Sequence, residues 1–325
     1  MAAFDPGTPG SANMVSNANV PNFIPELWSD EVLASYKANL VMPQLVTKMP
    51  FNGRKGDTIH LPKGVRGAAA AKAAQTQVSL IIGADSVFNL TVDQHWEYSR
   101  LIEDITAIQA LDSVRAFYTD DAGYALATRV DTDLHGEGAK FAAADASPTV
   151  AGSAYSKAVI GSDGSTAWNG AAATSTGNGA ALADAGIRRA IRELDDNDVP
   201  SRMRAWVVPP VEKENLMGVA RFTEQAFTGE AGSSNSIRNG LVGDLYGIPV
   251  YVSTNCATVL ADDSSTEYRA CLLFQKEAVV HAEQLAPRTQ TQYKQEFLAD
   301  LFTADILYGN GTMRPEAGLA LIVPA

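Results

Sequence analysis

The spacing of hydrophobic residues in the second half of the chain predicts a helix followed by a buried strand. Ile187, Ile191 and Leu194 recur at helical intervals. An acidic run and Pro200 follow them, and together they end the predicted helix. Residues 205–208 are all apolar, which predicts a short strand with both faces buried.

A second helix and a second strand are predicted downstream. Pro210 suits the first turn of a helix, and Glu212 and Glu214 place negative charge near the helix N-terminus. Gly247 then permits a turn into residues 248–252, where apolar side chains alternate with Pro249 and Tyr251. This order of helix, strand, helix and strand is the most informative pattern in the chain.

The longest helical pattern extends from residue 111 to residue 134. Apolar side chains recur there every three or four residues, at Leu111, Val114, Tyr118, Ala122, Leu126, Val130 and Leu134. Gly136 and Gly138 end the pattern. We therefore predict a helix of about six turns, although a long helix within an enzyme would give the same pattern.

Residues 51–93 have the pattern of a long two-stranded hairpin. Residues 57–62 alternate as a strand, residues 64–77 form a tip rich in glycine and alanine, and residues 78–92 return as two short strands. The hairpin has no evident core of its own, and an isolated hairpin is only marginally stable in water. It therefore either rests on a neighbouring copy of the chain or folds back on its own domain.

The two ends of the chain have different patterns. Residues 1–22 are rich in Gly, Ala, Ser, Asn and Pro and cannot bury enough surface to fold alone. Residues 27–36 carry an apolar helical stripe, which is interrupted at Pro43. Towards the C-terminus we predict strands at 270–274 and 278–282, a polar segment at 288–292, and a sheet completed by residues 297–311 and 318–325.

Composition narrows the classes of function. The chain has 325 residues, a formal net charge of −12 and only two cysteines, Cys256 and Cys271. The acidic balance argues against sequence-specific DNA binding, which needs clustered Lys and Arg. Two cysteines in so long a chain indicate a reducing compartment and two buried thiols. No apolar run is long enough to cross a membrane, and the N-terminus lacks the features of a signal peptide.

Local charge changes sign between the hairpin and the long helix. Residues 51–93 carry five basic and three acidic residues, whereas residues 103–137 carry two basic and eight acidic residues, so their net charges are +2 and −6. We expect the basic hairpin of one subunit to rest on the acidic helix of its neighbour. The basic residues of this predicted contact are Arg54, Lys55, Lys63, Arg66 and Lys72, and the acidic residues are Asp112, Asp120, Asp121, Asp131 and Asp133.

The sequence contains no recognisable catalytic or metal-binding motif. Phosphate-binding loops, the GxSxG nucleophile motif and metal-spaced histidine or cysteine pairs are missing. The four histidines, His60, His95, His135 and His281, stand far apart. Adjacent carboxylates, as in Asp120-Asp121, point in different directions on a helix and suit a solvated acidic face. We therefore predict no enzyme activity, cofactor or metal. The alternative from another class is an acidic hydrolase with a split active site.

Two segments of the chain resemble a known family. They are DVPSRMRAWVVPP at residues 198–210 and GDLYGIPVYVSTN at residues 243–255. Their order of elements resembles the axial domain of tailed-bacteriophage major capsid proteins, the Hong Kong 97-type capsid fold, and the likeness extends loosely over residues 24–325. The resemblance implies an α+β fold with an N-terminal arm (1–50), an extended β-hairpin loop (51–95), a peripheral domain with a long spine helix (96–141), an axial domain (142–268) and a return to the peripheral-domain sheet (269–325).

The resemblance also implies a function. A major capsid protein of this family self-assembles as hexamers and pentamers into an icosahedral shell that encloses double-stranded DNA. Its implied partners are copies of itself, a separate scaffolding protein, a portal protein and, as a further candidate, a decoration protein, with no membrane. The implied location is the virion capsid, assembled in the cytoplasm of a host bacterium. The alternatives are an encapsulin-type nanocompartment and a tail or decoration protein. No Lys–Asn cross-link is predicted, because Lys55, Lys63 and Lys72 match no linking set.

Overall fold

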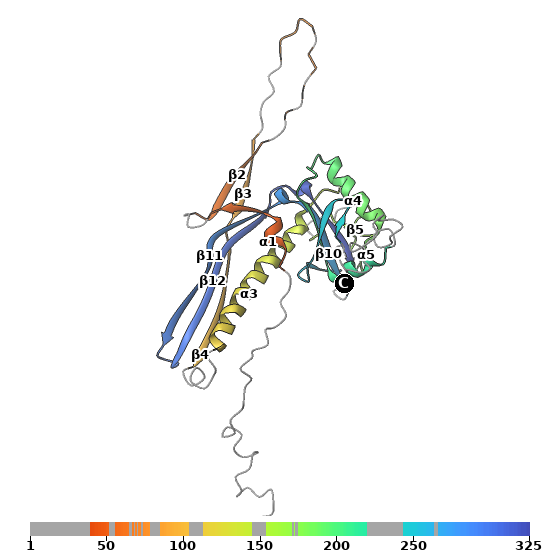
Figure 1. The fold of residues 1–325 in the computed structure, drawn as a ribbon. Coiled ribbons are helices and arrows are strands. Elements are labelled where there is room, and N and C mark those ends of the chain that lie inside the picture. Colours follow the sequence, from red (N-terminus) through yellow and green to blue (C-terminus); the bar gives the residue numbers. More distant parts are fainter. Residues whose placement is uncertain are drawn as a thin grey trace, which may run out of the picture.

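The computed structural model describes a large part of the chain. The described residues are 40–51, 56–64, 67, 69, 71–72, 74–78, 85–103, 113–144, 154–170, 172, 175–219, 243–262 and 266–325. Within them the chain forms two sheet-based bodies and one projecting hairpin, which give the molecule an elongated outline (Figure 1). The helical stripe predicted at 27–36 lies outside the described residues.

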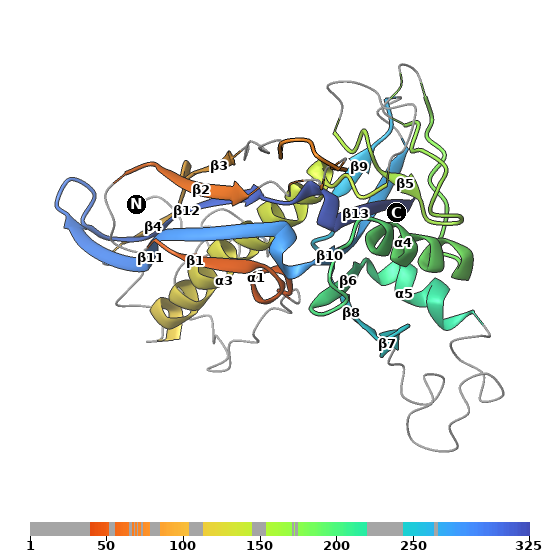
Figure 2. The same ribbon diagram turned by 90° about the horizontal axis from the view of Figure 1, so that it is seen from above.

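The first body, here called the core body, is built on a seven-stranded sheet. In the described chain its strand order is β5 (Val159–Ile160), β13 (Gly318–Pro324), β10 (Glu267–Gln275), β6 (Arg204–Val208), β8 (Ile248–Val252) and β7 (Asp244–Leu245), with β9 (Thr258–Leu260) also paired to β10. Helices α4 (Asp184–Asp196) and α5 (Pro210–Met217) belong to this body (Figure 2). The predicted helix–strand–helix–strand order is therefore confirmed as α4, β6, α5 and β8.

Local chemistry explains these elements. The stripe that includes Ile187, Ala190 and Leu194 is fully buried, which fixes α4 against the body. Pro210 stands in the first turn of α5. Strands β6 and β8 pair in parallel, and such a pair requires a crossover connection, which runs through α5.

The centre of the core body is closely packed. Strand β6 is buried along its whole length, and Trp206, Leu272 and Phe274 have no exposed surface. Trp168 is 2% exposed and packs edge-on against Tyr268 with ring centroids 4.8 Å apart. The core body therefore has its own hydrophobic core.

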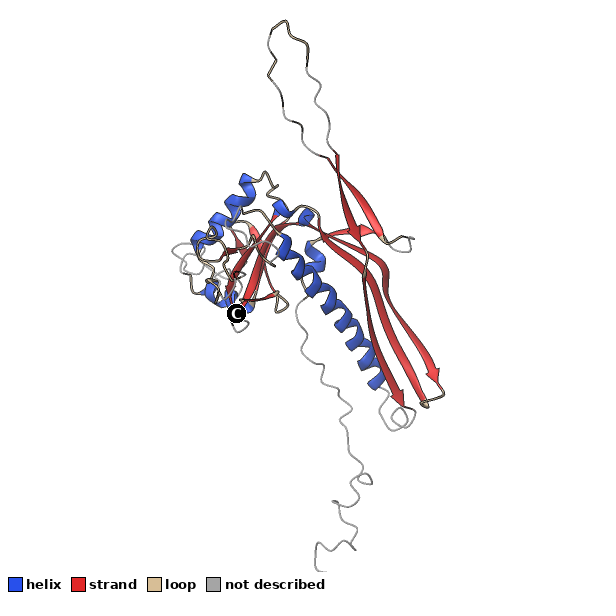
Figure 3. Ribbon diagram, turned by 180° about the vertical axis from the view of Figure 1, so that it is seen from behind, coloured by secondary structure: helices blue, strands red, loops and turns tan. Residues whose placement is uncertain are grey.

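The second body, here called the spine body, pairs a four-stranded sheet with a long helix. The strand order is β1 (Thr47–Pro50), β11 (Val279–Lys294), β12 (Ala299–Thr312) and β4 (Gln94–Glu103). Helix α3 (Ser113–Gly136) runs along this sheet (Figure 3) and buries the predicted stripe through Ala122, Leu126, Val130 and Leu134. The helix ends at the predicted Gly136, and a 3-10 turn, η2 (Glu137–Lys140), follows.

The two bodies are joined by direct crossings of the chain. Strand β10 leads into β11 through the 3-10 turn η3 (Lys276–Ala278), and β12 leads back to β13 through η4 (Pro315–Ala317). Phe141, which follows η2, packs against Phe274 with ring centroids 5.8 Å apart. The larger hydrophobic cluster contains side chains from both bodies.

Several predicted boundaries are wrong. Residues 269–325 do not return to a single peripheral sheet, because β10 and β13 pair with each other and with β6 and β5 in the core body. The apolar runs in these strands are buried on both sides, as in central strands. The polar segment 288–292 is part of strand β11.

The N-terminal boundary also needs correction. The last residues of the predicted arm 1–50 belong to the spine body, because β1 pairs in parallel with β11. Pro43 does not interrupt a helix but stands in the first turn of the short helix α1 (Met42–Leu45).

The hairpin is formed by β2 (Thr58–Gly64) and β3 (Asp85–Thr91), which pair antiparallel from Thr58↔Thr91 to Gly64↔Asp85. The end of β2 lies near the core body, because Lys63 and Gly64 line one pocket with residues 197–200. Residues 78–92 were predicted to return as two short strands, but their described part contains one strand, β3.

Candidate assembly interface

The base of the hairpin is fixed to the spine body by a small hydrophobic cluster. Its buried members are Phe51, Leu90, Val92, Val280 and Ala282. Two glycines of β12 allow this close approach. A β carbon at Gly309 would collide with the carbonyl oxygen of Thr91, and one at Gly311 would lie 2.8 Å from the Phe88 ring. The hairpin therefore has a defined origin on the subunit.

Beyond its base the hairpin keeps many side chains exposed, although Lys63 still contacts its own subunit at Glu316. Within the described residues β2 and β3 pair only with each other. Val87 is 58% exposed, and Val78, in the segment between the strands, is exposed as well. Exposed apolar side chains on a two-stranded ribbon gain stability only when a further surface covers them.

The structure describes two of the five predicted basic contact residues. Lys63 forms an ion pair with Glu316 of its own subunit, with Nζ and Oε1 3.1 Å apart and both side chains more than one third exposed. Lys72 is exposed. Arg54, Lys55 and Arg66 lie outside the described residues.

The predicted acidic residues of α3 have different environments. Asp120 is exposed. Asp121 accepts a hydrogen bond from the Tyr98 hydroxyl at 2.8 Å. Asp133 is 2.8 Å from Nη2 of Arg129 and accepts a hydrogen bond from the Tyr308 hydroxyl at 2.6 Å. Asp112 lies outside the described residues.

Asp131 must be withdrawn from the predicted contact. Its side chain has no exposed surface, and its carboxylate is hydrogen-bonded inside the subunit. It lies one helical turn before the buried Leu134, at the edge of the apolar stripe of α3. A neighbouring subunit cannot contact a residue in this position.

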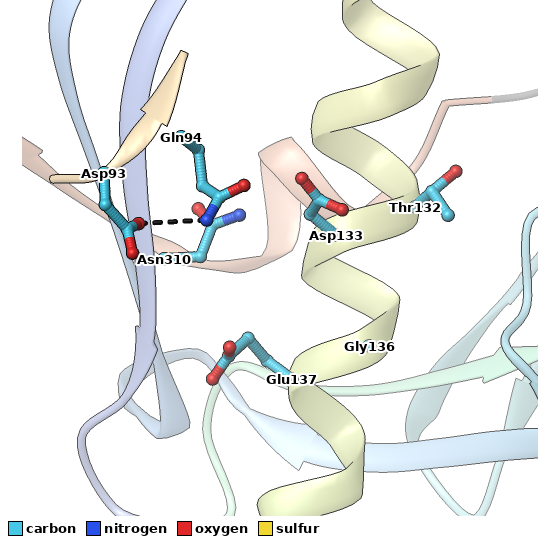
Figure 4. A pocket seen from close by; sticks show the side chains of 7 residues that line it. All are labelled: Asp93, Gln94, Thr132, Asp133, Gly136, Glu137 and Asn310. Carbon is cyan, nitrogen blue, oxygen red and sulfur yellow. Dashed lines mark hydrogen bonds between the residues drawn. The ribbon is translucent and has the colours of Figure 1, made fainter. Parts of the chain in front are cut away.

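A polar pocket of about 270 Å³ lies between the C-terminal end of α3, β12 and the turn before β4 (Figure 4). Its lining residues are Asp93, Gln94, Thr132, Asp133, Gly136, Glu137 and Asn310. Glu137 is 2.7 Å from Nζ of Lys140 and accepts a hydrogen bond from the Thr312 hydroxyl at 2.9 Å. Burial and the hydrogen bond to Asp133 raise the pKa of the neighbouring Tyr308.

This pocket brings together acids that the sequence placed in separate regions. Asp93 belongs to the segment predicted as basic hairpin, yet it lines the same pocket as Asp133 and Glu137 of the acidic helix region. The connection depends on the pairing of β4 with β12, which no local pattern specifies.

Sequence reasoning also missed two groups of exposed apolar side chains. One lies near the far end of the spine body and contains Leu101, Tyr293, Phe297 and Leu298. The other lies on the core body and contains Met203, Val211, Met217, Tyr246 and Leu260. Phe297 and Leu298 are more than half exposed, and they interrupt a polar turn, which is the signal that could have identified them.

The described residues show no assembled reactive centre. His60 and His281 each lie 2.6 Å from an asparagine, His95 lies 3.3 Å from Asp305, and no group of metal-ligating residues occurs among the residues described. Burial raises the pKa of the Cys256 thiol to about 12, which keeps it a poor nucleophile. In the same part of the chain no helix is long and apolar enough to cross a membrane.

Sequence comparisons give no relative for this chain, because no family model and no curated protein matches it. Solved structures do match. A chain of Mycobacterium phage Che8 aligns with a TM-score of 0.68 and 25% identity, covering 92% of this chain and 97% of that chain. The capsid of cyanophage P-SCSP1u aligns with a TM-score of 0.68 and 18% identity, covering 98% and 99%. The mature capsid of bacteriophage PhiM1 gives 0.67 and 16%, with 98% of both chains covered.

These alignments cover nearly the whole length of each chain, so the similarity extends over the whole arrangement of core body, spine body and hairpin. The chain has the α+β fold of phage capsid subunits, as the resemblance implied.

Proposed function

We propose that this chain is the major capsid protein of a tailed double-stranded DNA bacteriophage. The observation that carries the proposal is the full-length agreement with a chain of phage Che8 and with the capsids of P-SCSP1u and PhiM1, at TM-scores of 0.67–0.68. These particles come from phages, which favours a viral shell over the encapsulin-type alternative.

The geometry suits assembly. The core body folds around its own hydrophobic centre, whereas the hairpin and the far end of the spine body carry apolar side chains that the described residues leave exposed. Copies arranged as hexamers and pentamers repeat each such contact around closed symmetry axes. An icosahedral shell formed in this way encloses the genome, and the net charge of −12 lets the wall hold DNA without binding its sequence.

For the contact between neighbours, we keep the prediction that the basic hairpin rests on the acidic helix, without Asp131. Lys63 and Lys72, with Arg54, Lys55 and Arg66, face Asp120, Asp121 and Asp133, with Asp112, of the next subunit in this proposal. Each exposed pair contributes less than about 1 kcal/mol. The contact gains importance because every subunit repeats it.

Changing Lys55, Lys63 and Arg66 together to Glu tests this contact. The proposal predicts a folded subunit, by circular dichroism and thermal unfolding, that no longer forms shells. Shells formed as efficiently as by the unchanged protein would refute the contact.

The partners and place of assembly follow from the same proposal. A scaffolding protein, a portal protein and, as a candidate, a decoration protein act with the shell, and assembly takes place in the cytoplasm of the host bacterium. No catalytic step is part of the function.

Purified protein tests the function directly. Negative-stain electron microscopy and sedimentation of the protein expressed with its scaffold should show closed icosahedral particles. Particle size and a single portal vertex distinguish a phage shell from a nanocompartment. A compact monomer at high concentration would contradict the proposal and favour the alternative of an acidic hydrolase.

A further inference from the structure

The buried carboxylate of Asp131 connects three segments that are far apart in the sequence. Its Oδ1 atom accepts hydrogen bonds from the backbone N–H groups of Val41 and Met42, at 3.1 and 3.0 Å. Its Oδ2 atom accepts one from Nδ2 of Asn255, at 2.9 Å. Val41 and Met42 precede the spine body's first strand, Asp131 stands in α3, and Asn255 belongs to the loop after β8 of the core body. We call these four residues the Asp131 cluster.

The cluster is held in place from its own helix as well. His135, one turn after Asp131 and fully buried, lies with Nδ1 2.8 Å from the carbonyl oxygen of Asp131 and 3.5 Å from its Oδ2. Burial lowers the pKa of His135, so its ring is neutral at pH 7. From the core body, Cys256 follows Asn255, and its carbonyl oxygen accepts a hydrogen bond from Arg269 at 3.0 Å.

A buried carboxylate is costly unless hydrogen bonds satisfy it. Here two peptide N–H groups and one amide supply those bonds, and hydrogen bonds to a charged group are stronger than those between neutral groups. The peptide groups at residues 41 and 42 are therefore held more firmly than α1, a helix of only one turn, would hold them by itself.

The N–H groups of residues 41 and 42 stand where the N-terminal residues join the spine body. Leu40 is the first described residue of the N-terminal part, so the 39 residues before it join the subunit next to the cluster. Downstream, β1 pairs in register with β11 from Thr47↔Val280. Residues 41–50 are thus fixed at one end by Asp131 and at the other by β11.

We infer that Asp131 is a positioning residue for assembly: it fixes the backbone of residues 41 and 42, and so the point at which residues 1–39 are joined to the described chain, relative to both bodies at once. This inference rests on the proposed function, because a subunit that assembles in many copies needs the same backbone position at this point in every copy. Asp131 acts through the peptide groups of Val41 and Met42 and need not touch a neighbouring subunit.

A matched buried carboxylate provides the control. Glu212 has no exposed surface, accepts a hydrogen bond from the backbone N–H of Leu182 at 2.8 Å and another from Asn215 at 3.0 Å, and lies in the core body. Glu212→Ala removes a buried hydrogen-bonded acid without touching residues 41–50. Asp131→Ala removes both oxygens of the cluster, whereas Asp131→Asn keeps one oxygen for the two N–H groups.

Two measurements on the full chain separate positioning from general stability. Hydrogen exchange of the Val41 and Met42 amides in unassembled subunits should become about tenfold faster or more in Asp131→Ala and stay unchanged in Glu212→Ala. At a temperature where both variants are folded, the shell yield by sedimentation should fall about tenfold in Asp131→Ala relative to Glu212→Ala. Asp131→Asn should lie between Asp131→Ala and the unchanged protein in both assays.

Unchanged amide exchange in Asp131→Ala overturns the inference, and so does a shell yield equal to that of Glu212→Ala. If Asp131→Ala does not fold, Asp131→Asn and Glu212→Gln are compared in the same two assays and decide it by the same criteria. If the unchanged protein forms no shells, the proposed function fails. The amide exchange then still shows whether Asp131 holds residues 41 and 42.

Discussion

The core body differs from the hairpin and from the far end of the spine body in how much of its surface is buried within the subunit. Strands β6, β10 and β13 are almost entirely buried, and their side chains belong to one hydrophobic cluster. By contrast, residues 286–293 of β11 are exposed without interruption, and Val87 of the hairpin is 58% exposed. We therefore expect separate parts of the chain to determine the stability of the subunit and the assembly of shells. Substitutions in one part should change the free energy of unfolding, and substitutions in the other should change the shell yield.

The largest difference in stability is expected between the same substitution at two phenylalanines. Phe274 is fully buried in the core body, and Phe297 is 61% exposed at the end of the spine body. Phe274→Ala should lower the free energy of unfolding by about 3–5 kcal/mol. Phe297→Ala should change it by less than about 0.5 kcal/mol. Urea unfolding of unassembled subunits measures both.

The effect of Phe297→Ala should appear instead in the yield of assembled shells. Phe297→Ala should reduce the shell yield although the subunit remains fully folded, because its ring is exposed in the subunit and can contact a neighbour. If Phe297→Ala destabilises the subunit as much as Phe274→Ala does, the far end of the spine body has a core of its own and the comparison is wrong.

Two glycines test how closely the hairpin packs on the spine body. A β carbon at Gly309 would collide with the backbone of Thr91, whereas one at Gly123 of α3 meets nothing within 4 Å. Gly309→Ala should cost about 1–3 kcal/mol of stability. Gly123→Ala should instead stabilise the helix by about 0.5–1 kcal/mol. Thermal unfolding gives both values, and hydrogen exchange in β2 and β3 should accelerate only in Gly309→Ala.

Two histidines with the same kind of partner test the role of burial. His281 is 5% exposed and lies 2.6 Å from Asn310. Burial lowers its pKa, against smaller opposing effects of the Asn310 hydrogen bond and the Glu283 charge. A histidine with a lowered pKa in the folded state stabilises the fold above the unfolded pKa of about 6.5, and that stability is lost as the pH falls below it. The difference in unfolding free energy between the unchanged protein and His281→Gln should therefore shrink from pH 7 to pH 5.

The slope from one histidine cannot exceed about 1.4 kcal/mol per pH unit. His60→Gln is the control, because His60 is exposed and also lies 2.6 Å from an asparagine, Asn89. Urea unfolding at several pH values measures the effect. A pH dependence that is the same in both variants would show that burial of His281 is not its source.

The smallest effect is expected at the hairpin's own ion pair. Lys63→Glu places two carboxylates together at Glu316 and should cost less than about 1 kcal/mol, because both side chains are well exposed. Adding Glu316→Lys should restore that stability but not the shell yield, since the charge presented to a neighbour stays reversed. Restored assembly in the double variant would mean that Lys63 acts only inside its own subunit.

Patterns local in sequence predicted elements well. Helix α4, strand β6, helix α5 and strand β8 each follow from periodicity, a proline or an acidic first turn within a few residues, and the structure has all four. The buried apolar stripe of α3 and its end at Gly136 were likewise predicted from periodicity and from glycine.

Partnerships between distant segments were not predictable in this way. Nothing in residues 270–274 or 318–323 indicates that they pair with each other, or that the first pairs with β6 and the second with β5, instead of joining β11 and β12. Strand pairing and register are properties of the whole sheet. Asp131 illustrates the same limit for a site residue. Its charge favoured the surface, whereas its helical position beside Leu134 and the backbone of residues 41 and 42 placed it inside.

The two crossings between the bodies have a mechanical consequence. Because β10 runs into β11 and β12 runs into β13, a pull on the far end of the spine body reaches the centre of the molecule along the strands themselves. The pair β10–β13 is then drawn lengthwise past β6, so the hydrogen bonds from Leu272↔Val207 to Gln275↔Arg204 bear the load together and not one after another. In a shell wall under outward pressure, each subunit would carry tension through the hydrogen bonds between β10 and β6.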